Sequence, residues 1–371
     1  MTRSTPPQLT KPSDAEWPPE HLEHLGQCPV CKSTDRRVLY SGLTDRLFGC
    51  APGKWTLHKC AECACAYLDP RPDIKSIGQA YKQYFTHETS EPRTGNDTNL
   101  SSATPWRQRV RMWLRAGLNG YRNKRWGMAL TPSNAWGRWW VPLVWPLKSV
   151  LVTQMRNLPR QLPRPGATLL DVGCGNGDFL IMARAAGWQV QGVDFDPLAV
   201  ETARKHGLNV HHGGLEQLTQ HHEHYDWITC SHVVEHVHDP VQWLRDMYVL
   251  LRPGGTLWLQ TPNINSLGLS RFGVNWRGLE PPRHLVIFDL RCLLQKLREC
   301  GFQPQTYQLP ALSAMAVYAA SEALRDNRNA TLSLRLGELL RLSYLVSAVQ
   351  QAVSVQNAEF ITITATKERR P

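Results

Sequence analysis

No stretch of about 18 or more uninterrupted apolar residues occurs in the sequence, which argues against an ordinary transmembrane helix. The N-terminus lacks the apolar core of a secretory signal and is instead polar and rich in proline. We therefore expect residues 1–20 to form a disordered tail and the protein to be cytoplasmic. In that compartment the ten cysteines favour metal ligation and ordinary thiols over a disulfide framework.

Acidic residues are missing between Ser101 and Pro165, a basic segment that contains twelve lysine and arginine residues. The whole chain has 42 basic and 31 acidic residues, for a formal net charge of +11, so the basic segment accounts for the entire excess. Seven of the 14 tryptophans also lie here, between Trp106 and Trp145.

The basic segment is predicted to be helical and amphipathic. On a helical wheel Trp106, Val110 and Trp113 fall on one apolar arc, with Arg109 and Arg115 on the other side. Three interpretations are open: a helical cap on the domain that follows, a peripheral contact with an anionic membrane, or nucleic-acid binding by phosphate pairing and stacking. The first two are compatible, because one helix can cover a pocket while its basic face meets lipid headgroups.

Four regions follow from composition. After the tail at residues 1–20, a cysteine-bearing module occupies residues 21–72, and an extended stretch with the helical linker occupies residues 73–164. Residues 165–371 form the last region, in which we expect a helical insert at about residues 310–355.

The last region alternates between buried strands and helices. The segments "TLLDVG", "QVQGVDF", "DWITCS" and "TLWLQTP" are typical of strands, and "FLIMARAAG" and "DPLAVETARKHG" are typical of helices. This alternation predicts an α/β fold with a doubly wound, mostly parallel sheet.

A glycine-rich loop follows the first of these strands. A dinucleotide fingerprint would need a third glycine where the chain has Asp178, whereas the glycines stand at Gly173, Gly175 and Gly177. Asp171 precedes the loop, and its carboxylate repels a pyrophosphate but suits a ligand with an ammonium group and a sulfonium. Glycine lets the backbone approach such a ligand closely.

The next strand ends at Asp194, where a carboxylate can accept hydrogen bonds from ribose hydroxyls. With "GGLEQL", "ITCSHVVEHVHDP", "LLRPGGTLWLQTPN" and "AEFITITATK" in register, residues Gly166 to Lys367 resemble the class I S-adenosylmethionine-dependent methyltransferases. The resemblance implies a seven-stranded Rossmann-like domain that binds S-adenosylmethionine. The cofactor-binding residues that it implies are Asp171, Gly173, Cys174, Gly175, Gly177, Asp194, Phe195, Leu215 and Ser231.

The cysteine module contains two CxxC knuckles, Cys28–Cys31 and Cys60–Cys63. Two such knuckles close a tetrahedron around Zn²⁺, and four cysteines leave no open position, so the predicted zinc is structural. A β-hairpin within "RRVLYSGLTDRLF" is expected between the knuckles. The continuation "CAYLDPRPD" resembles a zinc-binding module that precedes methyltransferase domains of glycan and cell-envelope modification.

The segment after "DWITC" normally faces the transferred methyl group in this family. It contains neither the Asn/Asp-Pro-Pro-Tyr/Phe motif of base-directed amino methyltransferases nor the Pro-Cys nucleophile of cytosine C5 enzymes. It has His232, Glu235 and His236, whose spacing would place them on one helical face. We expect His284 to meet them.

These four candidate catalytic residues allow three interpretations. A neutral histidine, preferably His284, can be the general base for a hydroxyl acceptor. All four can instead bind a divalent cation, an arrangement that resembles the E-x-x-E-H motif of ubiquinone-pathway and small-RNA 2′-O-methyltransferases, with His232 in place of the first Glu. In the third interpretation, a Glu–His pair only holds the loop.

The combined prediction is O-methylation of a carbohydrate or lipid-linked glycan intermediate at the cytoplasmic face of a membrane. A hydroxyl acceptor suits the histidines, and an anionic diphosphate-linked glycan suits the basic segment. One alternative is an RNA methyltransferase that grips nucleic acid with the zinc module and the arginines. Another is a non-catalytic scaffold that binds S-adenosylmethionine.

Overall fold

The computed structural model describes residues 15–81, 105–159, 163–308, 312–328 and 354–369. The chain forms two compact units. Residues 1–85 and 230–371 make up the first unit, and residues 86–229 make up the second.

One seven-stranded sheet has the strand order β12-β13-β10-β9-β6-β7-β8. Its strands are β6 (Thr168–Val172), β7 (Gln189–Asp194), β8 (Asn209–His212), β9 (Tyr225–Ser231), β10 (Leu251–Pro262), β12 (Phe302–Thr306) and β13 (Phe360–Lys367). β6, β7 and β8 pair in parallel, whereas β13 is antiparallel to both β10 and β12. The predicted α/β methyltransferase fold is confirmed, and each strand expected from the alternation is present.

Helices separate these strands along the chain, and several begin at an aspartate. They are α4 (Asp178–Ala185), α5 (Pro197–Lys205), α6 (Pro240–Leu250) and α8 (Leu290–Glu299). The carboxylates of Asp196, Asp239 and Asp289 accept hydrogen bonds from the first backbone N–H groups of α5, α6 and α8. In α5 and α6 a proline then occupies the first helical position, where a missing N–H costs nothing.

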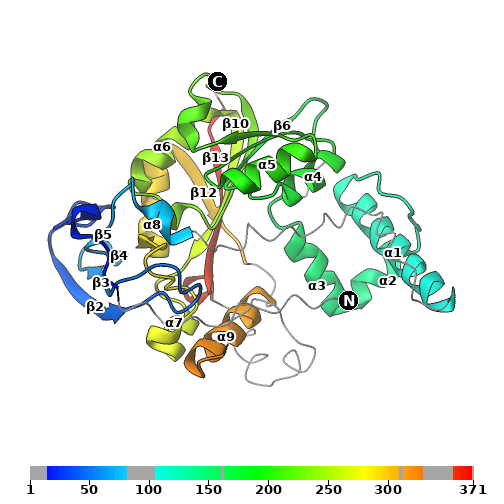
Figure 1. Ribbon diagram of the computed structural model, residues 1–371. Coiled ribbons are helices and arrows are strands. Elements are labelled where there is room, and N and C mark those ends of the chain that lie inside the picture. Colours follow the sequence, from blue (N-terminus) through cyan, green and yellow to red (C-terminus); the bar gives the residue numbers. More distant parts are fainter. Residues whose placement is uncertain (1–14, 82–104, 160–162, 309–311, 329–353, 370–371) are drawn as a thin grey trace. The chain divides into compact units, whose positions relative to one another are not determined.

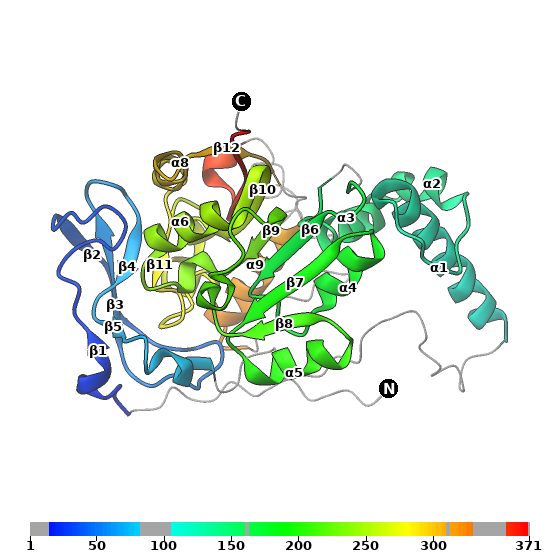
Figure 2. The same cartoon turned by 90° about the horizontal axis from the view of Figure 1, so that it is seen from above.

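In the second unit β6, β7 and β8 lie side by side (Figure 2). The basic segment of this unit forms α1 (Pro105–Trp126), α2 (Gly137–Trp140), the 3₁₀ helix η4 (Val141–Leu143) and α3 (Trp145–Gln154). Its later residues share one core with the strands and α4, since Tyr121, Val141 and Leu151 belong to the same buried cluster as Leu169 and Leu180. Part of the basic segment is therefore core, as expected for a cap.

The first unit also contains a four-stranded sheet of order β11-β4-β3-β2 (Figure 1). Its strands are β2 (Arg36–Leu43), β3 (Trp55–Cys60), β4 (Ala66–Leu68) and β11 (Val286–Ile287), and β1 (Leu22–Glu23) pairs separately with β5 (Arg71–Pro72). The expected hairpin within residues 36–48 is wrong in its second strand: β2 pairs with β3, which ends at Cys60. The two strands of the hairpin thus bring the knuckles together.

The cysteine module shares its core with segments far along the chain. Trp55 and Leu68 pack in one buried cluster with Phe272 of α7 (Leu267–Phe272) and Tyr318 of α9 (Leu312–Arg325). The pairing of β4 with β11 continues this contact through backbone hydrogen bonds. In the first unit the module is therefore part of a larger body.

Several predictions fall on other residues. Most of the expected tail (1–14), most of the extended stretch (82–104) and residues 329–353 of the expected helical insert lie outside the described residues. The described part of the insert is helical in α9. Within the described ranges, every helix is too short or too polar to cross a membrane.

Candidate functional site

The glycine-rich loop between β6 and α4 has the backbone that glycine permits. Gly173, Gly175 and Gly177 have φ values of 72°, 52° and 83°, in the left-handed region that other residues rarely adopt. At Gly177 space is limiting too, since a Cβ would lie 2.3 Å from Cδ1 of Leu208. The loop therefore presents backbone without side chains, which lets a ligand approach closely, as a nucleoside-binding site requires.

Asp171 lies at the end of β6, and its side chain has one neutral partner among the described residues. The hydroxyl of Thr229 donates a hydrogen bond of 2.6 Å to Oδ1, and the residue is 5% exposed. Burial and, to a smaller extent, the charge of Asp194 raise the pKa of Asp171 to about 7, although the hydrogen bond from Thr229 and the charge of Arg156 lower it. A buried carboxylate whose pKa stays this high suits a ligand that brings a positive charge of its own.

Asp194 stabilises the glycine loop from the end of β7. Its Oδ2 accepts a hydrogen bond of 2.7 Å from the backbone N–H of Gly175, and its Oδ1 accepts one of 2.9 Å from Asp196. Burial raises the pKa of Asp194, and these two hydrogen bonds oppose the rise. Each oxygen keeps a second lone pair, so Asp194 still has the capacity to accept hydrogen bonds from ribose hydroxyls.

The remaining predicted cofactor residues differ in what they offer. Phe195 is exposed and Leu215 is buried at the start of the 3₁₀ helix η5 (Leu215–Leu218). Cys174 is buried, and its Sγ occupies the space that a Cβ on Gly192 would need, at 2.6 Å. Any contact between Cys174 and a ligand at the glycine-rich loop is therefore a backbone contact. Ser231 ends β9 and belongs to the first unit.

Four thiols come together at the two knuckles. The Sγ atoms of Cys28, Cys31, Cys60 and Cys63 all lie within 4.8 Å of one another. Sγ of Cys28 is 3.6 Å from that of Cys63, and Sγ of Cys31 is 3.5 Å from that of Cys60. Zn–S bonds of about 2.3 Å give tetrahedral S···S edges of about 3.8 Å, so these thiols fit a Zn²⁺ ion.

The two knuckles share one backbone feature. The residue after the second cysteine is left-handed in both, with φ of 65° at Lys32 and 60° at Ala64. This repeated strain turns each chain away after presenting two thiols. Two further thiols, Cys65 and Cys292, lie within 4.8 Å of Cys63.

A second polar cluster joins three of the four predicted catalytic residues. One ligand atom each of Glu235, His236 and His284 lies within 4.8 Å of the others. The rings of His236 and His284 meet edge to face, with centroids 4.8 Å apart. The predicted approach of His284 to the segment after β9 is therefore what the structure shows.

His232 reaches this cluster in a different way from the one expected. It has φ of 57°, and only the 3₁₀ helix η6 (Val234–His236) follows, so no α-helical face carries His232, Glu235 and His236. The left-handed turn at His232 still directs its Nδ1 to Oε1 of Glu235, at 3.2 Å. The ring of His232 also packs edge-on against Phe360, with centroids 4.8 Å apart.

Glu235 is fully buried and well supplied with partners. Its Oε2 accepts a hydrogen bond of 2.9 Å from the hydroxyl of Thr261. Burial alone would raise the pKa of Glu235, but the hydrogen bond from His232 and the neighbouring imidazoles lower it to about 2. The carboxylate is therefore ionised throughout the physiological range.

Backbone carbonyls determine which nitrogen carries the proton in two of the histidines. Nδ1 of His284 lies 2.8 Å from the carbonyl oxygen of Gly278, and Nδ1 of His236 lies 2.9 Å from that of Arg283. A carbonyl oxygen can only accept, so Nδ1 is the donor in both contacts, and in the neutral ring of His284 the lone pair is on Nε2. The hydroxyl of Tyr81 also lies 3.0 Å from Nδ1 of His236. Burial lowers the pKa of His284 to about 4, so this ring is neutral at physiological pH.

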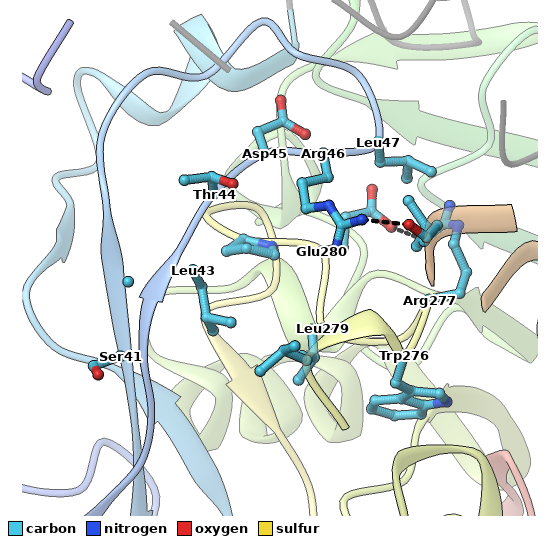
Figure 3. Close-up of a pocket in the computed structure, with 14 residues that line it drawn as sticks. Ser41, Leu43, Thr44, Asp45, Arg46, Leu47, Trp276, Arg277, Leu279 and Glu280 are labelled. Atoms are coloured by element: carbon cyan, nitrogen blue, oxygen red, sulfur yellow. Dashed lines mark hydrogen bonds and ion pairs between the residues drawn. The ribbon is translucent and has the colours of Figure 1, made fainter. Parts of the chain in front are cut away.

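A pocket of about 230 Å³ opens next to this cluster, within the first unit (Figure 3). It is lined by residues 41–47, by Val274, Trp276, Arg277, Leu279, Glu280 and Pro281, and by Leu324. Glu280 connects the pocket to the cluster, because it lines the pocket and its Oε2 lies 3.7 Å from Nε2 of His284. Figure 3 shows Arg46 and Arg277 reaching into this region from different segments of the chain.

Among the described residues, two of the three arginines around the pocket form ion pairs with carboxylates, and the third does not. Arg283, fully buried behind it, binds Asp45 through two guanidinium nitrogens and Glu280 through Nε at 3.1 Å. Arg277 pairs with Glu280. Arg46, in contrast, has only neutral acceptors within the described part of the chain: it donates to Oδ1 of Asn275 at 2.5 Å, to Oδ1 of Asn327 at 3.0 Å and to the carbonyl of Leu324.

Sequence reasoning missed the residues that complete both clusters. Thr229 and Thr261 belong to strands and resemble any other strand residue in the sequence. Arg46 and Glu280 are far apart along the chain and meet only through the pocket. The signal for Glu280 was its place four residues before His284, in the same proline-bearing loop.

Comparison with known proteins agrees with this geometry. Residues 152–307 match the family model of a methyltransferase domain. Over 135 residues the chain is 32% identical to a ubiquinone biosynthesis O-methyltransferase of Coxiella burnetii (strain Dugway 5J108-111), covering 34% of this chain and 58% of that protein. Over 137 residues it is 34% identical to the protein of the same name from Nitrosospira multiformis, covering 34% and 57%. The chain thus spans just over half the length of these curated relatives.

Among solved structures, a SAM-dependent methyltransferase from Archaeoglobus fulgidus aligns with a TM-score of 0.39 and 19% identity, over 60% of this chain and 94% of that one. The seven-stranded sheet and the family match define the class: the chain contains a class I S-adenosylmethionine-dependent methyltransferase domain. The glycine-rich loop and the buried carboxyl group of Asp171 are the part of this domain that suits the positively charged methyl donor.

Proposed function

We propose that the protein transfers a methyl group from S-adenosylmethionine to a hydroxyl oxygen of a carbohydrate or lipid-linked glycan. The observation that carries this proposal is the neutral ring of His284, which contacts His236 beside a polar pocket. Nε2 of His284 is left as a proton acceptor, because the carbonyl oxygen of Gly278 engages Nδ1. The relatives support transfer to oxygen, since both are named O-methyltransferases.

When bound, S-adenosylmethionine supplies a methyl group that its positive sulfur already activates. The chain has to align the acceptor oxygen for an in-line displacement and to take the hydroxyl proton. In the proposal, Nε2 of His284 takes that proton. A pKa of about 4 keeps the ring neutral but makes it a weak base. The carboxylates of Glu235 and Glu280, which face the ring, therefore have to stabilise the imidazolium as it forms.

The pocket supports an acceptor with a negatively charged group. Arg46 has no carboxylate partner among the described residues, and Nε of Arg277 is buried there without a hydrogen-bond partner. A phosphate or carboxylate on the acceptor would bind to these guanidinium groups. A sugar carried on a diphosphate has both the anionic group and the hydroxyl, and a lipid carrier would bring the reaction to the cytoplasmic face of a membrane.

The experiment uses the full chain, methyl-labelled S-adenosylmethionine and a crude extract of cell-envelope lipids and glycans, with total RNA as a separate acceptor. We expect label in a glycan or lipid-linked glycan fraction. His284→Gln should lower kcat by about 10²–10⁴, with an unchanged calorimetric affinity for S-adenosylmethionine. His222→Gln, at an exposed histidine, is the matched control. Label found only in RNA or in a phenolic quinone precursor would contradict the proposed acceptor.

A metal at Glu235, His236 and His284 is the competing interpretation of the same cluster. If those residues bound an essential cation, treatment with EDTA would abolish transfer and added Mg²⁺ or Mn²⁺ would restore it. Under the general-base proposal, transfer persists after EDTA as long as the zinc content of the protein is unchanged. Measuring both quantities in one sample separates the two mechanisms.

We also propose that the four knuckle cysteines hold a structural Zn²⁺. Since β2 and β3 connect the knuckles, the ion would lock the sheet to which β11 also belongs. Cys31→Ser should then lose about one zinc per chain by atomic absorption and melt at a lower temperature. Cys65→Ser is the control, because Cys65 lies beside the site without belonging to either knuckle. Equal zinc content in the two variants would refute the assignment.

A further inference from the structure

We propose that the second unit carries a docking surface for a membrane of anionic phospholipid, formed by α1, α2 and η4. We call this the aromatic surface and define it by Trp113, Trp136, Trp139, Leu143 and Val144. The inference concerns the basic segment alone. It does not depend on which acceptor the enzyme methylates.

The aromatic surface exposes side chains that a water-soluble surface normally hides. Leu143 is 84% exposed, Trp136 is 73%, Trp139 is 64% and Trp113 is 54%. They come from neighbouring elements of one unit, since α2 packs against α1 and continues directly into η4. Exposed apolar residues gathered in this way mark an interaction site.

The packing of α2 explains why the apolar stripe of α1 is open at one end. Gly117 and Gly137 allow a close approach of the two helices, and a Cβ on Gly137 would lie 1.8 Å from the carbonyl oxygen of Gly117. Trp140 of α2 stacks on Trp113 at 5.5 Å between centroids. The N-terminal half of α1 extends beyond α2 in both views (Figures 1 and 2). Val110 and Leu114, on the same stripe, are correspondingly exposed there.

Charge complementarity identifies the partner surface as anionic. Residues 101–165 contain twelve lysine and arginine residues and no acidic residue. Arg109, Arg111 and Arg138 are exposed, and the guanidinium of Arg138 lies over the ring of Trp139, 5.0 Å from its centroid. Tryptophan at the headgroup level with arginine beside it is the usual pattern at a lipid interface. Basic residues near an anionic bilayer add electrostatic attraction.

The aliphatic side chains favour lipid over nucleic acid. Stacking on bases would use the tryptophans and arginines, but it has no use for Leu143, Val144 or Val110. A hydrocarbon interface takes up aromatic and aliphatic side chains alike.

The test is co-sedimentation of the full-length protein with vesicles. One set contains phosphatidylcholine alone, and the other contains equal parts of phosphatidylcholine and phosphatidylglycerol. We expect binding to the anionic vesicles only, weakened by salt. The variant Trp136→Ser/Trp139→Ser should bind at least tenfold more weakly. Val38→Ser/Ile74→Ser removes exposed apolar residues of the first unit and should bind normally.

Calorimetric affinity for S-adenosylmethionine, measured on the same samples, shows that each variant is folded and keeps this test separate from the proposed function. Four outcomes would overturn the inference: no vesicle binding by the wild type, equal loss in both variants, binding of RNA without binding of anionic vesicles, or burial of the same tryptophans in a stable dimer seen by sedimentation velocity. Unimpaired glycan methylation together with absent vesicle binding would reject the membrane surface alone.

Discussion

Asp171, near the end of β6, and Glu235, in the 3₁₀ helix η6, are both buried carboxylates, yet their pKa values move in opposite directions. The pKa of Asp171 rises to about 7, whereas that of Glu235 falls to about 2. Burial opposes ionisation in both, so the difference comes from the neighbours. Glu235 is surrounded by imidazoles and accepts a hydrogen bond from Thr261. Asp171 accepts a hydrogen bond from Thr229, and the repulsion of Asp194 opposes the weaker attraction of Arg156.

This contrast distinguishes a carboxylate whose charge the surrounding protein stabilises from one whose charge would be stabilised by a cationic ligand. The charge at Glu235 is compensated by the protein itself, so it belongs to a preorganised cluster. The charge at Asp171 is only partly compensated, because burial and Asp194 outweigh Thr229 and Arg156, so its ionised form costs the folded state free energy. A cationic ligand removes that cost. The difference indicates that Asp171 binds a ligand, whereas Glu235 supports neighbouring side chains of the protein.

The largest expected effect is the loss of donor binding on neutralising Asp171. Asp171→Asn keeps an oxygen that can accept from Thr229 but removes the charge. We expect the affinity for S-adenosylmethionine to fall by about 10–100-fold, as for the loss of a charged hydrogen bond. Isothermal titration calorimetry measures the change. An affinity equal to that of the wild type would refute the role of Asp171 and end the comparison.

The next prediction concerns stability, where the two carboxylates should respond with opposite signs. The pKa of Asp171 in the folded state lies above its ordinary value of 3.8, so its ionisation destabilises the fold fully above pH 7 and not at all below pH 4. Asp171→Asn should therefore raise the melting temperature at pH 8, with a gain that vanishes near pH 4.

For Glu235 the sign is reversed. Its folded-state pKa lies below the ordinary value of 4.5, so its ionisation stabilises the fold above pH 4.5, and this stability is lost as the pH falls toward 2. Glu235→Gln should lower the free energy of unfolding at neutral pH by about 1–3 kcal/mol. Urea denaturation of both variants at pH 8 measures the pair. Two shifts of the same sign would show that the contrast is not electrostatic.

A smaller effect should appear in the pH dependence of the wild type. Ligand binding requires ionised Asp171, so the affinity for S-adenosylmethionine should be constant above pH 7 and weaken toward about tenfold per pH unit below it. Transfer from saturating donor should show no step from His284 above pH 5, because burial holds the pKa of that ring at about 4. A kcat profile with a midpoint near pH 6.5 would point to a different base.

The smallest expected effect concerns the acceptor pocket. Arg46→Met removes the guanidinium whose described partners are all neutral. We expect KM for an anionic acceptor to rise about tenfold while kcat and donor affinity stay the same. Arg37→Met, on the neighbouring strand β2, is the control. A change in kcat without a change in KM would place Arg46 outside acceptor binding.

By itself the sequence determined the methyltransferase fold and the glycine-rich loop. Strand–helix alternation and glycine spacing are local properties, and left-handed φ values at Gly173, Gly175 and Gly177 follow from residue type. The grouping of the four knuckle cysteines could also be predicted from the sequence, because a CxxC turn presents both of its thiols without help from distant residues.

Only the tertiary structure decided what surrounds these local features. A helical spacing suggested one face for His232, Glu235 and His236, but the chain makes a left-handed turn and a 3₁₀ helix there. Thr229, Thr261, Glu280 and Arg46 gained their roles from segments that approach in space. The pKa of a buried carboxylate depends on such neighbours, and no local pattern records them. The exposure of Trp113, Trp136 and Trp139 likewise depends on how much of α1 is covered by the packing of α2.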